Sequence, residues 1–174
     1  MRTKLSPLGA LGRGFAAGAI GTAAMTAWQE LSSRLQQSGG GEAGGAGGSQ
    51  PQDPWEKASA PAQVGRRIVR GVFQRDPAPE LIPVFTHGMH WAYGTGWGGA
   101  YGLIGGSIGD GDGPLRRGIL LGTAVWTASY LQLVPMGLYQ PPWKYPPKQL
   151  AMDLSYHIVY GAGTALGWRA LDRG

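Results

Sequence analysis

The sequence predicts an all-α integral membrane protein, a four-helix bundle built from two repeated helical hairpins. Only 14% of the 174 residues are charged, while 32 are glycine, and long stretches carry no charge at all. The septet His-x-x-Tyr-Gly-x-Gly occurs twice, at 90–96 and 157–163. A shorter pattern, Arg-Gly-x-x-x-Gly, precedes each copy, at 13–18 and 117–122. Because both patterns recur in the same order, they indicate a duplicated hairpin.

We expect a single membrane domain over 1–174, with spans at about 8–35, 81–106, 115–138 and 149–171. A span needs roughly 20 predominantly apolar residues. The uncharged runs at 81–109 and 118–143 are long enough alone, whereas the runs at 14–29 and 154–168 need their flanks. The alternative is a soluble helical bundle whose glycine-rich helices bury against one another.

The first span is rich in alanine and glycine, with Gly14 and Gly18 four residues apart. Small residues at this spacing let two helices approach closely in lipid. Residues 36–61 form a flexible glycine-rich loop. A short amphipathic helix follows at 62–75, because its apolar side chains share one side and its arginines the other. We expect this helix to lie at the membrane interface, with a solvated helix docked on the bundle as the alternative.

The later spans carry further packing positions for a glycine zipper: Gly94, Gly98, Gly102, Gly118, Gly122 and Gly161. A short Gly/Asp turn is expected at 107–113, between the second and third spans. The segment 94–99 also matches the dinucleotide fingerprint G-x-G-x-x-G. That fingerprint requires a preceding strand and a helix that opens at the glycines. Here the glycines lie in the middle of a predicted helix, so we reject the match.

Polar side chains recur on one stripe of the second and fourth spans: His87, His90, Tyr93, Asp153, His157 and Tyr160. Ionisable groups are costly in lipid and usually face the bundle interior or water, so we expect a shared inward-facing polar cluster. The favoured interpretation is inter-helix hydrogen bonding, with Asp153 fixing the tautomer of His157. A proton-handling or transport pathway is the alternative.

No cofactor or metal is expected from these residues, although His90 and His157 on facing helices leave a haem or metal site as a further alternative. The sequence contains no cysteine, which excludes disulfides, thiolate zinc sites and iron–sulfur clusters. No motif of nucleophilic or metalloprotease chemistry is present, so no catalytic residue is predicted. The sequence favours a structural or accessory membrane protein, with a small transporter or proton-handling protein as the alternative.

The net charge of +5 is spread over every loop and tail. This distribution suits contact with anionic lipid headgroups and does not suit a single nucleic-acid face. We therefore expect membrane lipids as partners and no nucleic acid. The glycine faces also predict pairing with a second copy or another membrane protein.

The segment Pro135-Met-Gly-Leu, the Pro-Pro-Trp run at 141–143 and the following helix with His157 resemble the uncharacterised bacterial inner-membrane proteins of the YagU type. The likeness covers about the last two-thirds of the chain, and the glycine-rich loop departs from it. The resemblance implies a bacterial inner-membrane location and four membrane-spanning helices, and it implies no mechanism.

With four spans, both termini and the 107–113 turn share one side of the membrane. Among the short segments this side carries seven basic residues and the other carries two, which favours cytoplasmic termini by the positive-inside rule. The seven are Arg2, Lys4, Arg13, Arg116, Arg117, Arg169 and Arg173; the two are Lys144 and Lys148.

Overall fold

A computed structural model describes residues 6–38, 53–105 and 113–172, and this part of the chain is all-α, with five α-helices and no strands. The predicted helical class is confirmed. The turn expected at 107–113 and the centre of the loop expected at 36–61 lie outside the described residues. The α-helices are α1 (Pro7–Ser38), α2 (Ala60–Phe73), α3 (Ile82–Gly105), α4 (Pro114–Leu133) and α5 (Pro147–Asp172). Short 3-10 turns occur at Pro54–Lys57, Pro79–Leu81 and Pro142–Lys144.

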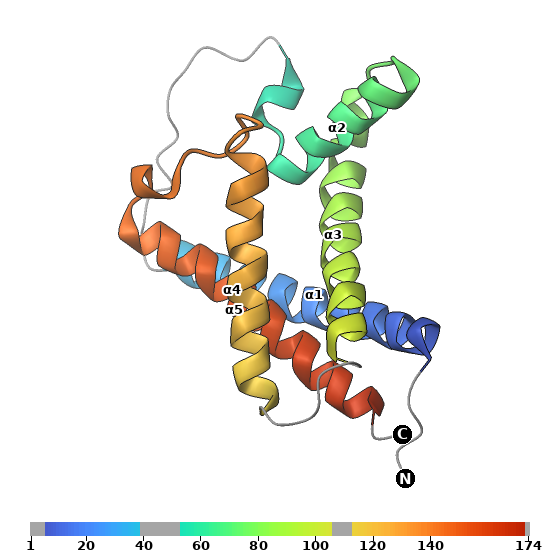
Figure 1. The fold of residues 1–174 in the computed structure, drawn as a ribbon. Helices are drawn as coiled ribbons and strands as arrows, with labels where there is room; N and C mark the ends of the chain where they lie inside the picture. Colours follow the sequence, from blue (N-terminus) through green and yellow to red (C-terminus); the bar gives the residue numbers. More distant parts are fainter. Residues whose placement is uncertain (1–5, 39–52, 106–112, 173–174) are drawn as a thin grey trace.

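The long helices pack in the order α3, α1, α5, α4 (Figure 1). Helices α1 and α5 form a central antiparallel pair, and α3 and α4 stand across them. Each outer helix therefore rests on the inner helix of its own hairpin: α3 on α1, and α4 on α5. Helix α2 packs against α3 and lies at the end of the molecule remote from the described chain ends.

Glycines join α1 to α3 with almost no space between the two backbones. A β-carbon on Gly14 would lie 2.5 Å from the carbonyl oxygen of Gly98, and one on Gly18 would lie 2.8 Å from that of Gly94. A β-carbon on Gly102 would meet the backbone of α1 at Ala10 and Gly14. Only residues without a side chain permit such an approach, so these glycines form the interface that their spacing predicted.

The helices of the second hairpin, α4 and α5, also meet through glycines, but in a different register. A β-carbon on Gly118 would lie 2.9 Å from the carbonyl oxygen of Gly161, and Gly122 contacts the α5 backbone at His157. Gly14 packs on Gly98 in the first hairpin. The sequence repeat matches Gly14 to Gly118 and Gly98 to Ala165, so it predicts a contact between Gly118 and Ala165. Gly118 instead meets Gly161, one helical turn earlier. The two hairpins are thus alike in construction but slipped by four residues.

The interior of the bundle consists mainly of small residues, and the exterior is apolar. Gly, Ala, Thr and Ser supply most buried positions, and no leucine, isoleucine or phenylalanine among the described residues is buried. Large apolar side chains point outward instead; Leu8 is 81% exposed, Leu131 73% and Val84 63%. This distribution is the reverse of that in water-soluble proteins, where such side chains are mostly inside.

The hydropathy of the helices differs from what the predicted spans require. Within residues 6–38, 53–105 and 113–172, no helix is both long and apolar enough to count as a membrane span. The prediction relied on the absence of charges, but glycines, hydroxyl residues and histidines lower the average hydropathy of each helix. Freedom from charge is therefore not the same property as apolarity.

The segment at 53–76 is held together by Arg66. Its guanidinium donates to Asp53 at 2.7 Å and to both carboxylate oxygens of Asp76 at 2.7 and 2.8 Å, and it lies 5.4 Å from the ring centre of the buried Trp55. The backbone N–H of Trp55 and the Arg66 guanidinium lower the pKa of the Asp53 carboxyl, and Arg66 lowers that of Asp76. Arg67 donates to the carbonyl oxygen of Met136 at 2.7 Å, which ties α2 to the end of α4.

Candidate binding cavity

A cavity of about 400 Å³ lies between α3 and α4, with the central pair forming its floor and the start of α2 at one end. All the polar residues selected from the sequence line it: His87, His90, Tyr93, Asp153, His157 and Tyr160. Side chains from α1, among them Thr22 and Thr26, complete the wall together with Ser59 and Val64 near α2. The stripes predicted on the second and fourth spans, which are α3 and α5, therefore face one shared space.

The packing of the helices explains why the space opens here. Helices α1 and α5 meet through small residues, since a β-carbon on Gly163 would lie 3.1 Å from the α-carbon of Gly21. Helices α3 and α4 pack mainly on α1 and α5, respectively, and not on each other, so space remains between the two outer helices.

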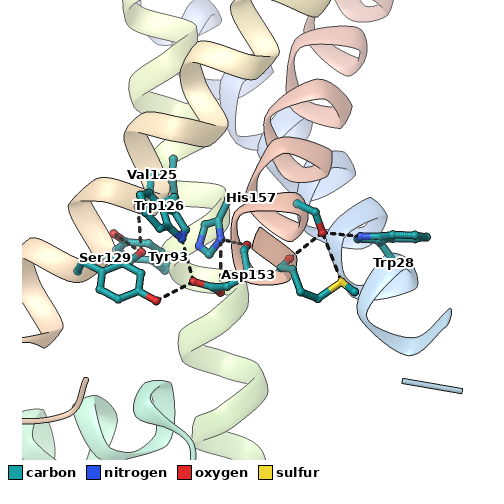
Figure 2. Close-up of polar contacts among 10 residues, drawn as sticks. Trp28, Tyr93, Val125, Trp126, Ser129, Asp153 and His157 are labelled. Carbon is teal, nitrogen blue, oxygen red and sulfur yellow. Dashed lines mark hydrogen bonds and ion pairs between the residues drawn. The ribbon is translucent and has the colours of Figure 1, made fainter. Parts of the chain in front are cut away.

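Asp153 is the only carboxylate among the residues that line the cavity. Figure 2 shows it beside Trp126 and His157. Its Oδ2 accepts hydrogen bonds from the indole N–H of Trp126 at 2.9 Å and from the hydroxyl of Tyr130 at 3.2 Å. Sequence reasoning missed both donors, although their spacing of four residues places them on one face of α4. An acidic residue on the facing helix was the signal that could have found them.

His157 is oriented by the backbone and not by the Asp153 carboxylate. Its Nδ1 lies 2.9 Å from the carbonyl oxygen of Asp153 and 3.8 Å from Oδ1 of the same residue. A carbonyl oxygen can only accept, so Nδ1 carries the proton and Nε2 is the acceptor of the neutral ring. The tautomer is therefore fixed by the main-chain carbonyl oxygen of Asp153, which accepts the hydrogen bond from Nδ1, and not by the carboxylate as expected.

His90 and the two tyrosines are placed differently from one another. Nε2 of His90 is buried and has no hydrogen-bond partner among the described residues. The hydroxyl of Tyr160 donates to the carbonyl oxygen of Gly94 at 2.6 Å, which links α5 to α3. The hydroxyl of its septet counterpart Tyr93 accepts a longer hydrogen bond of 3.5 Å from the hydroxyl of Ser129. The duplicated tyrosines thus share a cavity but have unequal roles.

Chemically, the cavity offers acceptors and aromatic rings and little positive charge. No lysine or arginine of residues 6–38, 53–105 and 113–172 lines it. In the part of the chain that the structure describes, no cluster of three or more His, Asp or Glu side chains is arranged to hold a metal ion.

Comparison with family models, curated proteins and solved structures finds no match to this chain. The resemblance to proteins of the YagU type therefore stays a prediction.

Proposed function

We propose that the chain is a multi-pass membrane protein that binds a small amphipathic molecule in the cavity between α3 and α4, as a small transporter does. The observation that carries the proposal is the arrangement of the six selected polar side chains. They border a space of about 400 Å³, although Tyr160 and Asp153 also bond directly to neighbouring helices. Ligand sites are usually concave and lined by apolar groups with a few polar ones.

The distribution of apolar side chains supports placement in lipid. Large apolar residues are exposed on all four long helices; examples are Leu31 on α1, Ile104 on α3, Leu120 on α4 and Leu166 on α5. Contiguous apolar surface of this kind marks contact with a membrane or a protein partner. The small buried residues fit the same environment, where packing and not exclusion of water holds helices together.

The low average hydropathy of the helices is compatible with this placement. Glycines of each long helix face other helices, whereas some of the leucine, isoleucine or valine residues of each long helix are exposed. An average over both sides understates the apolarity of the outer side, and only that side would meet lipid.

The role of accessory protein has less support from the geometry. All eight glycines selected as packing positions contact other helices of the same chain. Their close-packing surfaces are therefore already used and do not require a second molecule. We retain anionic membrane lipids as the proposed partners, with cytoplasmic termini in a bacterial inner membrane.

Membrane fractionation tests the placement. We expect the protein to remain in the membrane pellet after washing at alkaline pH and to be released only by detergent, because its apolar exterior would be exposed in water. The peripheral proteins of the same membranes serve as the control. Recovery of the protein in the supernatant before detergent is added would contradict the membrane proposal.

Filling the cavity tests the binding proposal. Thr26 lines the cavity, and its hydroxyl bonds only to the carbonyl oxygen of Thr22, one turn earlier in the same helix. We expect Thr26→Phe to abolish binding of 2-phenylethanol, a neutral amphipathic probe, because the ring would occupy the space. Isothermal titration of purified protein in detergent measures the binding.

Thr127 provides a matched control. It makes the same type of bond, to the carbonyl oxygen of Thr123, but it is exposed on α4 and outside the cavity. Thr127→Phe should leave binding intact. Equal binding by both variants, or no binding by the unmodified protein, would show that the cavity does not hold such a molecule.

A further inference from the structure

We infer that the cavity selects an organic cation, a small molecule that combines an ammonium group with an apolar body. This inference rests on the proposed ligand-binding function and specifies its substrate class. The feature that carries it is the incomplete coordination of Asp153 at the cavity wall.

The two carboxylate oxygens of Asp153 are used unequally. Oδ2 accepts from Trp126 and Tyr130, whereas Oδ1 accepts no hydrogen bond from the described residues; Nδ1 of His157 lies 3.8 Å from it, which is too long for a hydrogen bond. An ionised carboxylate has about four acceptor positions. With two of them filled, Asp153 can accept further N–H donors from a molecule in the cavity that it lines.

The negative charge of Asp153 also lacks a permanent counter-ion. In the part of the chain that the structure describes, no lysine or arginine lines the cavity. Nδ1 of His157 already donates to the main chain, and its ring compensates the carboxylate only when it is protonated. An intramembrane carboxylate is costly unless it is paired or faces water. A bound ammonium group would supply both the missing charge and the missing donors.

The rest of the wall suits the same ligand and disfavours an anion. Tyr93, Tyr139 and Tyr160 line the cavity, and aromatic rings attract cations through their negative faces. Nε2 of His157 is a further acceptor in the neutral ring. Among the described residues a carboxylate or phosphate ligand would find no lysine or arginine in the lining, and it would be repelled by Asp153.

Three probes of nearly equal shape test the inference: phenethylamine as the cation, 2-phenylethanol as the neutral analogue and 3-phenylpropionate as the anion. We expect the amine to bind the full-length protein in detergent at least about tenfold more tightly than the alcohol, because charge-assisted hydrogen bonds are roughly twice as strong as neutral ones. The anion should not bind measurably.

The variant Asp153→Asn removes the charge and keeps an oxygen that can accept from Trp126 and Tyr130. We expect it to bind the amine no more tightly than the alcohol. The matched control is Asp172→Asn, since Asp172 pairs with Arg13 at 3.4 Å and does not line the cavity; it should keep the preference for the amine.

The comparison of the three probes on the unmodified protein does not depend on how any variant folds. If the alcohol or the anion binds as tightly as the amine, the cation inference is overturned and the cavity function stands. A preference for the amine that survives Asp153→Asn overturns it as well. If none of the probes binds, the proposed binding function fails together with the inference.

Discussion

Replacing Gly98 by alanine is expected to destabilise the bundle by about 1–3 kcal/mol, the usual cost of overpacking a tight interface. The added β-carbon would lie 2.5 Å from the carbonyl oxygen of Gly14 and 2.6 Å from the backbone nitrogen of Gly18. These neighbours are backbone atoms of α1, so no side-chain rotation can make room. The helices can only separate, and α1 is the main packing partner of α3. Unfolding in detergent, followed by circular dichroism, measures the change.

Gly96 on the same helix is the matched control. A β-carbon there would meet nothing within 4 Å, and alanine favours helix over glycine by about 1 kcal/mol. Gly96→Ala should therefore stabilise the protein slightly, so the two substitutions are expected to have opposite signs. A loss of stability from both, or from neither, would show that α1 and α3 do not meet through Gly98.

The glycine interfaces were predictable because their cause is local. Close approach of two backbones requires the absence of a β-carbon, and spacing by four residues puts such positions on one side of a helix. The register was not predictable. A stripe repeated every four residues fits its partner equally well after a slip of one turn, and Gly118 does meet Gly161 one turn away from the position that the repeat implies.

The cavity was predictable only in part. Helical periodicity correctly grouped residues such as His90 and Asp153 on inward-facing stripes. It did not reveal that the stripes would border an open space, since this depends on α3 and α4 packing on different inner helices. The bond from His157 to the main chain was also hidden, because a pattern of residue types does not contain side-chain direction.

Replacing Tyr160 by alanine is expected to cost about 3 kcal/mol of folding free energy, the lower end of the range for a buried aromatic residue. The side chain is only 2% exposed, packs with Met25 and Val125, and donates to the carbonyl oxygen of Gly94 at 2.6 Å. The value falls at the lower end because the space left behind would join the existing cavity, which Tyr160 already lines. The same unfolding measurement in detergent determines the loss.

Two further variants separate the sources of this loss. Tyr160→Phe keeps the ring and removes the hydroxyl, so it should cost about 1 kcal/mol, as expected for one hydrogen bond. Tyr93→Ala changes the septet counterpart, which is less buried, packs against Trp97, and whose hydroxyl has a 3.5 Å contact with Ser129; its cost should be smaller than that of Tyr160→Ala. If the two tyrosines instead contributed equally, the unequal roles assigned to them would be wrong.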